Sequence, residues 1–239
     1  MAFGQFKQIK TIISLFIPIF SKAGIKVMAE KEGIGKSRLE ALSDGIFAFA
    51  MTLLVISLAV PLVPDGEAAV LLPGKIAEMF PEFVIFSIAF FIIAGYWLAH
   101  HRILRSIEYV DDRLIWTNLL LLFFIVLIPF TTSISGDYNA VFEAVLLFHI
   151  NLLCASIALT LIWLYIRSQY AKLTNEEEPE NRLKQFEATG RFRALAIPAI
   201  TIVAIFVSFI NPAGSMYCYL LIPVIMVAGK KSSTSCMVE

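Results

Sequence analysis

The stretch that decides the fold is RLEALSDGIFAFAMTLLVISLAVP, which runs from Arg38 to Pro61. After its first turns it is built almost entirely from Ala, Phe, Ile, Leu and Val, with Thr52 and Ser57 as the main exceptions. Ionisable side chains are costly in hydrocarbon, so an Arg and an Asp at the mouth of a spanning helix mark a candidate functional site. We therefore take Arg38 and Asp44 as the first candidates.

The composition of the whole chain is that of a membrane protein. Hydrophobic residues make up 59% of its 239 residues, and the mean hydropathy is +0.80, which places it in the membrane class. The net charge is zero, so nothing predicts a nucleic-acid partner. Cys154, Cys218 and Cys236 lack the spacing of a disulfide framework or a zinc site, and we predict no cofactor and no metal.

Six segments approach the length of about 20 mainly apolar residues that a bilayer requires. They are Leu42–Val63, Phe83–His101, Leu114–Ser133, Val141–Tyr165, Ala194–Ile210 and Ala213–Ala228. The last two are short and separated by Asn211-Pro212, a turn signal. The sequence therefore predicts an all-α, polytopic membrane protein with six transmembrane helices.

The distribution of Lys and Arg orients these spans. If the N-terminus, the loops 102–113 and 166–193 and the C-terminal tail are cytoplasmic, 18 of the 19 basic residues lie inside. The acidic run 176–180 then belongs to a solvated cytoplasmic loop. The outer side combines Lys75 with five acidic residues, either a rim that concentrates cations or ordinary acidic loops. The five are Asp65, Glu67, Glu78, Glu82 and Asp137.

The chain divides into three predicted parts: an N-terminal extension at 1–35, a six-span domain at 36–230 and a cytoplasmic tail at 231–239. The apolar run Ile9–Phe20 follows two lysines but is too short to span a bilayer and is broken by Pro18. We expect an interfacial or disordered extension. A cleaved signal peptide and a start at Met28 are the alternatives.

One face of the first helix carries Gly45, Phe49, Thr52 and Ile56 at helical spacing. If several copies of this helix surround an axis, Phe49 and Ile56 form apolar rings and Thr52 forms a ring of hydroxyls. Apolar constrictions gate by dewetting, and rings of oxygens can partly replace the hydration of an ion. The alternative is ordinary helix packing, with Thr52 bonded to its own backbone.

Polar residues recur near the cytoplasmic ends of the first three spans. Ser43 and Asp44 can cap the first helix, whereas Arg38 either reaches lipid headgroups or a buried partner. The other members are Trp97, His100, His101 and Asn118. Adjacent histidines point about 100° apart on a helix, so one of the two faces the bundle. We predict a hydrogen-bonded cluster between helices.

Three segments carry a resemblance to a known family. RLEALSDG resembles the Arg-x-x-x-Phe-Ser-Asp signature of the transmembrane protein 175 family of potassium channels, with Leu42 in place of the usual Phe. GYWLAHHR at 95–102 and DDRLIWTNLLLLFFIVLIPFTT at 111–132 resemble the second and third spans of that family. The resemblance is specific over residues 36–134 and rests mostly on hydropathy from there to 230.

The resemblance implies a homotetramer in which four first helices line a central pore without a TVGYG filter. It places the narrowest point, an Ile or Leu in the family, at Phe49 of this chain. It also implies that Thr52 affects selectivity and that Ile56 forms a second apolar ring. The polar network of the family corresponds to Arg38, Ser43, Asp44, Trp97, His100 or His101, and Asn118.

We therefore expect a passive, potassium-permeable channel and not an enzyme, in a prokaryotic cell membrane with both termini cytoplasmic. Its partners would be K⁺, the lipid bilayer and three further copies of the chain. A first rival is a proton-coupled transporter or a proton leak that uses Asp44 and His100 or His101. A second rival is an intramembrane enzyme with a metal held by His100, His101, Asp111 and Asp112.

Overall fold

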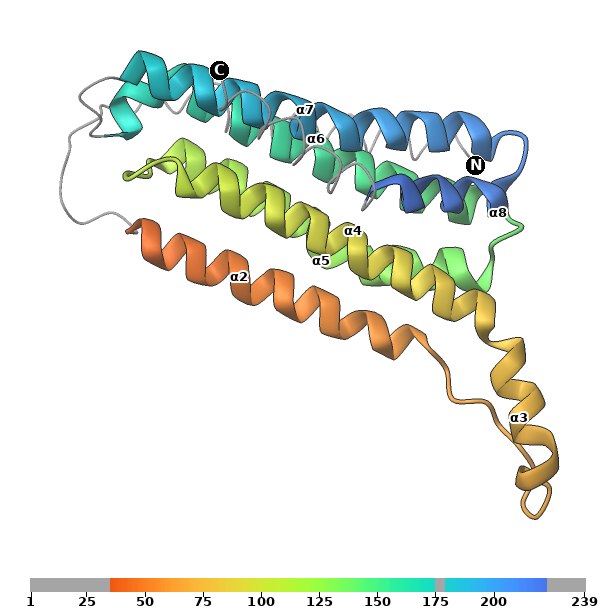
Figure 1. Ribbon diagram of the computed structural model, residues 1–239. Helices are drawn as coiled ribbons and strands as arrows, with labels where there is room; N and C mark the ends of the chain where they lie inside the picture. The colour runs from red at the N-terminus through yellow and green to blue at the C-terminus, as the bar shows by residue number, and fades with distance from the viewer. Residues whose placement is uncertain (1–34, 175–178, 223–239) are drawn as a thin grey trace, which may run out of the picture. The chain divides into compact units, whose positions relative to one another are not determined.

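The computed structural model describes residues 35–174 and 179–222, which all lie in the second of the two units of the chain, 34–239. Every regular element in these ranges is a helix (Figure 1). The elements are α2 (Lys36–Leu53), η1 (Leu54–Ser57), α3 (Ala68–Glu78), α4 (Phe80–Arg105), α5 (Asp112–Asp137), α6 (Phe142–Leu173), α7 (Pro179–Ser208), α8 (Pro212–Ser215) and η2 (Met216–Leu220). The predicted all-helical class is confirmed for these residues.

Four of the helical segments are long and apolar enough to cross a membrane. They are Lys36–Ile56, Phe80–Arg105, Asp112–Asp137 and Phe142–Leu173, and they contain most of the first predicted span and all or nearly all of the next three. The fifth predicted span lies in α7, whose described apolar part is Ile197–Ser208. The sixth begins with α8 and η2, and its residues beyond 222 lie outside the described part of the chain.

The core lies between α4, α5, α6 and α7. In it α6 packs along both α5 and α7, as Figure 1 shows. Tyr96 of α4 is fully buried, and its hydroxyl lies 2.7 Å from the carbonyl oxygen of Leu152 and 2.6 Å from the hydroxyl of Ser156. A buried phenol needs such partners because hydrocarbon offers none. α2 is added to this core through contacts with α4 and α5.

The first span differs from its predicted bounds, Leu42–Val63. The helix begins earlier, at Lys36, and its α-helical part ends at Leu53, after which Leu54–Ser57 form a 3₁₀ turn. Pro61 rules out a helix that continues to Val63, because it has no N–H for a helical bond and restricts the backbone of the residue before it. A 3₁₀ turn is a common way for an α-helix to finish.

The predicted loop 166–193 is mostly helical, which corrects the sequence prediction. α6 continues to Leu173 and α7 already begins at Pro179, a residue type favoured in the first turn of a helix. Phe186 of α7 contacts the rings of Trp163 and Tyr170 at centroid distances of 6.2 and 5.6 Å. These contacts extend the α6–α7 pair beyond the apolar spans.

Two shorter connections also differ from the prediction. The loop 102–113 shrinks to 106–111, because α4 continues to Arg105 and α5 begins at Asp112. The loop between the first two spans contains α3, which sequence analysis did not predict. Apart from Gly35, the predicted N-terminal extension lies outside the described residues, as do most of the 176–180 run and the tail 231–239.

A buried histidine fastens the C-terminal helices to α6. His149 is fully buried, with its Nε2 2.8 Å from the Ser215 hydroxyl and its Nδ1 2.8 Å from the Tyr219 hydroxyl. Ser215 donates its own proton to the carbonyl of Pro212 at 2.6 Å. Nε2 therefore carries a proton and donates it to Ser215, while Nδ1 accepts from Tyr219. A neutral imidazole satisfies both bonds at once.

Replacing His149 by leucine should weaken this attachment. His149→Leu keeps an apolar side chain in the core but leaves the hydroxyls of Ser215 and Tyr219 without their partner. We expect a loss of about 1–2 kcal/mol in the free energy of unfolding, measured by denaturant or thermal unfolding in detergent. Leu147→Ala, at an exposed position on the same helix, is the control. Equal stability of His149→Leu and the wild type would contradict the assignment.

Candidate ion pathway and its polar support

A polar cluster joins α2 to α4 and α5. The Trp97 indole donates from Nε1 to Asp44 at 2.8 Å, and Asn118 donates from Nδ2 to the Ser43 hydroxyl at 3.0 Å. The Oδ1 atom of Asn118 lies 2.6 Å from Nε2 of His100. Five of the seven predicted cluster residues are thus linked across three helices, in two separate connections.

One of the two connections is buried, and its hydrogen bonds among Ser43, His100 and Asn118 form one consistent set. Ser43, His100 and Asn118 are at most 1% exposed. Ser43 donates to the carbonyl of Leu39 at 2.8 Å, so its oxygen is free to accept from Asn118. Asn118 Oδ1 can only accept, which requires that His100 carries its proton on Nε2. Because every member has a partner, this connection fixes the rotation of α2 against α4 and α5.

The two adjacent histidines have different surroundings. His100 is buried and its ring lies 5.5 Å from that of Phe47 on α2. His101 is exposed and stacks on Trp97, with a centroid distance of 5.7 Å and an interplanar angle of 26°. His100 is therefore the histidine that faces the interior. His101 supports the ring of Trp97 from the surface.

The structure does not bring Arg38 into this cluster. Its side chain is exposed, and within 35–174 and 179–222 it has no hydrogen bond or ion pair. Ser43 and Asp44 also do not cap α2, because the helix begins a full two turns before them, at Lys36. Upstream helix-forming residues such as Leu39 and Glu40 favour this early start.

The geometry does not favour the metal site of the second rival. Asp111 caps the start of α5 by accepting from the backbone N–H of Leu114 at 3.0 Å, and it accepts a second bond from the Tyr165 hydroxyl. Asp112 lies in the first turn of the same helix, where a negative charge is favourable. Among the described residues, no group of three or more His, Cys, Asp or Glu could hold a metal ion.

α2 has one covered and one uncovered face. Its buried residues form a single stripe, and at 100° per residue the stripe of Gly45, Phe49, Thr52 and Ile56 lies about 150° away. The buried stripe consists of Leu39, Ser43, Phe47, Ala50 and Leu54. On the other face Phe49 is 60% exposed and Ile56 is 74% exposed. Only 28% of the apolar window of α2 is buried, compared with 50–56% in the other three candidate spans.

Three residues of the uncovered face differ in what they offer: a hydroxyl, open space and a turn in the backbone. The Thr52 hydroxyl donates to the carbonyl of Phe49 at 2.8 Å, so its oxygen lone pairs remain available for another donor or a cation. A Cβ added at Gly45 would meet nothing within 4 Å, so packing within the chain does not require a glycine there. Ile56 lies in the 3₁₀ turn, where each residue advances about 120° instead of about 100°, which shifts it around the axis from Thr52.

Sequence analysis missed two side chains that the structure makes prominent. His149 lies in the middle of an apolar span, and an ionisable residue at that depth is itself a signal. Lys36 stands in the first turn of α2, where the helix dipole disfavours a cation. Neither belongs to a recognisable motif, and each has its hydrogen-bond partners far away along the chain.

These features define a class: a membrane protein that is helical in its described residues. One of its helices is held by polar bonds on one side and uncovered on the other. Residues 38–129 match the family described as "Endosomal/lysosomal potassium channel TMEM175". This segment, which contains the polar cluster, is therefore similar to the TMEM175 family.

Individual relatives extend this match. A protein of Chryseobacterium sp. (strain P1-3), named as a potassium channel, is 31% identical over 127 residues, or 53% of this chain and 62% of its own length. The zebrafish "Endosomal/lysosomal proton channel TMEM175" is 29% identical over 133 residues, or 54% of this chain and 24% of its own. The matched part therefore spans less than two thirds of either relative.

A solved structure is similar over a longer range. The crystal structure of a lysosomal potassium-selective channel TMEM175 homolog from Chamaesiphon minutus has a TM-score of 0.64 and 27% sequence identity. The similarity covers 81% of this chain and 97% of the homolog. The helical fold described above is thus a known fold of membrane channels.

The amide of Asn118 should be the most sensitive member of the cluster. Asn118→Leu has a similar volume but leaves Ser43 and His100 without their shared partner, so we expect a loss of about 1–2 kcal/mol in stability. Thermal unfolding monitored by size-exclusion chromatography measures it. Asn139→Leu, in the turn after α5, provides the matched control. A loss no larger than that of the control would contradict the role of Asn118 as a bridge.

Proposed function

We propose that the chain is one subunit of a homotetrameric channel that conducts potassium passively, with four copies of α2 around the pore. The observation that carries the proposal is the two-sided character of α2. The cluster of Ser43, Asp44, Trp97, His100 and Asn118 turns one side of the helix toward its own subunit. The opposite side remains uncovered over the same length.

The composition of the uncovered side fits contact with further protein better than contact with lipid alone. Ala41, Gly45 and Ala48 are small and exposed, and small residues allow helices to approach closely in membranes. Gly45 has open space at its Cβ position, which another helix could use. The relatives named as potassium channels and the channel structure of similar fold support this arrangement.

Along the proposed pore, an ion would meet three rings. Phe49 and Ile56 supply apolar constrictions that close by dewetting, and the faces of Phe49 could also attract a cation at close range. Thr52 lies between them and presents oxygen lone pairs, because its proton is engaged by the carbonyl of Phe49. Asp44 is a positioning residue on this account, since its carboxylate is held by Trp97.

The proposal includes the topology expected from the sequence. Residues 36–230 form six spans, with 1–35 and 231–239 as cytoplasmic flanking segments, in the membrane of a prokaryotic cell. The basic loops place the Lys36 end of α2 in the cytoplasm. The acidic residues of the opposite end, among them Glu67 and Asp137, would then concentrate cations at the outer mouth.

A proton pathway through the same pore is the second candidate function. The observation in its favour is the similarity to the zebrafish protein that is named a proton channel. The test below therefore compares K⁺ flux with and without a pH gradient. A coupled transporter that uses Asp44 or His100 would instead show K⁺ movement driven by a pH gradient alone.

Flux from liposomes that contain the purified protein tests the proposal. We expect K⁺ flux down its gradient, independent of a pH gradient and larger than Na⁺ flux. Thr52→Ala should change the K⁺/Na⁺ ratio while the protein still folds and assembles, because it removes the ring of oxygens. Asp44→Ala should instead reduce assembly, because it removes the acceptor of Trp97.

Two controls make the result decisive. Thr160→Ala, a hydroxyl on α6 bonded within its own helix, should leave the ratio unchanged. A folded Thr52→Ala variant with the wild-type ratio would contradict the pore-lining assignment. Absence of K⁺ flux in both the wild type and Phe49→Ala, in tetrameric protein, would contradict the channel itself.

A further inference from the structure

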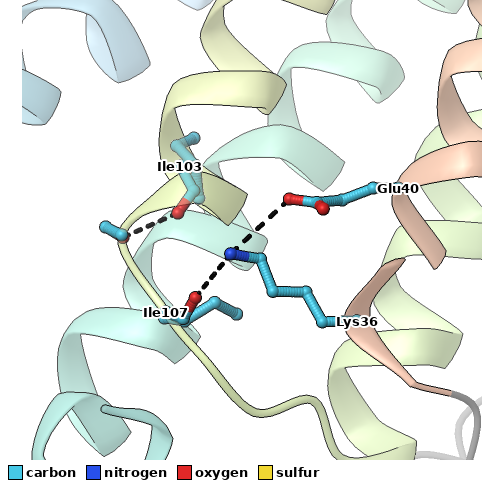
Figure 2. Close-up of polar contacts among 5 residues, drawn as sticks. Lys36, Glu40, Ile103 and Ile107 are labelled. Carbon is cyan, nitrogen blue, oxygen red and sulfur yellow. Dashed lines mark hydrogen bonds and ion pairs between the residues drawn. The ribbon is translucent and has the colours of Figure 1, made fainter. Parts of the chain in front are cut away.

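The first turn of α2 carries a contact that neither the signature nor the polar cluster includes. The Lys36 ammonium donates from Nζ to the backbone carbonyl of Ile107 at 2.7 Å, and Glu40 Oε1 lies 3.6 Å from the same nitrogen. Figure 2 shows Lys36 extended between these two oxygens. We call the Lys36–Ile107 contact the tether.

The position of Lys36 is unfavourable for α2 itself. A cation at a helix N-terminus opposes the dipole. α2 has neither an acidic residue in its first turn nor a side-chain cap at Gly35. A Lys followed by a Glu four residues later is also the weaker orientation of such a pair. Local helix energetics therefore do not explain this lysine.

The surroundings of its acceptor do explain it. α4 ends at Arg105, and Ile107 is the second residue beyond it, so its carbonyl lies at the negative end of that helix dipole. A lysine that bonds a carbonyl near a helix C-terminus is a favourable arrangement. Lys36 thus stabilises the C-terminal end of α4, although its acceptor lies 71 residues away in the sequence.

The loop that holds the acceptor is itself fixed to α6. The backbone N–H groups of Glu108 and Tyr109 both donate to the carbonyl of Leu173, at 2.8 and 3.1 Å. Asp111, at the end of the same loop, accepts from the Tyr165 hydroxyl. Because the loop 106–111 is bonded to α6 at both of these points, the tether connects α2 to a rigid part of the subunit.

The tether and the polar cluster hold α2 at two levels. Lys36 precedes Asp44 by eight residues, about 12 Å along the axis, and Phe49 follows Asp44 by five residues, about 8 Å on the other side. A helix held at one level can tilt about it, whereas a helix held at two levels cannot. Without the tether, movement of the Lys36 end would turn α2 about the cluster and displace Phe49 in the opposite direction.

We propose that the tether fixes the tilt of α2 and that Lys36 is a positioning residue for conduction; this inference rests on the proposed function. Passage through an apolar constriction depends steeply on its radius, since a small widening lets water enter. A helix that samples a larger range of tilt angles more often widens the constriction at Phe49. Loss of the tether raises the mean flux.

The test compares Lys36→Met, which keeps the aliphatic stem but loses the donor, with Lys36→Arg, which keeps a charged donor. Lys172→Met is the matched control, because Lys172 is an exposed lysine near the end of α6. Potassium flux from liposomes and hydrogen exchange of the α2 and 106–111 amides are measured on the same tetrameric preparations. We expect Lys36→Met to raise K⁺ flux about three-fold or more.

Exchange in Lys36→Met should increase at residues 38–42 and remain low at 45–53, beyond the cluster. Lys36→Arg and Lys172→Met should match the wild type in both measurements. Exchange in Lys36→Met equal to that of the control would overturn the tether, whatever the flux. Faster exchange with wild-type flux would overturn the positioning role.

The failure of the proposed function has a separate signature. If neither the wild type nor Phe49→Ala carries K⁺ while Lys36→Met still increases exchange at 38–42, the channel assignment is overturned. The positioning role of Lys36 in conduction is then overturned as well, although the contact between Lys36 and the loop is demonstrated. Unchanged thermal unfolding of Lys36→Met shows that the variant has not simply lost its fold.

Discussion

The rotation of α2 about its own axis is the constraint on which the rest of the account depends. Two bonds set it, one from Trp97 to Asp44 and one from Asn118 to Ser43. In hydrocarbon such bonds have no competition from water, and a helix that turned away would leave buried polar groups unsatisfied. With this side fixed, the opposite side of α2 must face outward from the subunit. Phe49 and Thr52 lie on that side because the bonds of Ser43 and Asp44 fix the rotation of the helix.

The chain therefore combines a rigid part with a lightly held helix. α6 packs against both of its neighbours, and the buried groups of Tyr96 and His149 have partners on other helices or in other turns. α2 contacts α4 and α5 with one stripe and depends on a few polar contacts for its orientation. Elements with few buried contacts are those that move at low energetic cost. This division suits a helix whose small displacements would open or close an apolar ring.

Hydropathy and helical periodicity predicted the helical class, the four long spans and the face of α2 that carries Gly45, Phe49, Thr52 and Ile56. The bounds were less predictable. The first α-helix ends at Leu53 in a 3₁₀ turn, and the Phe186 contacts extend α7 through a segment that charge alone marks as a loop. In the cluster, residue types at a common depth indicated Asn118 and His100. The sequence could not show that Arg38 lies outside it, since a long side chain near a helix start can reach either lipid or protein. His149 and Lys36 were missed because their hydrogen-bond partners lie 66 to 71 residues away.

The central claim is that the uncovered face of α2 lines the ion pathway. Thiol modification tests it most directly, in a background in which Cys154, Cys218 and Cys236 are replaced by serine. A water-soluble, charged thiol reagent should block K⁺ flux through Thr52→Cys and leave Phe123→Cys unaffected, because Phe123 is an exposed residue of α5. Block at position 52 alone is the result that our account predicts. A Thr52→Cys channel that reacts with the reagent and still conducts as before would contradict it.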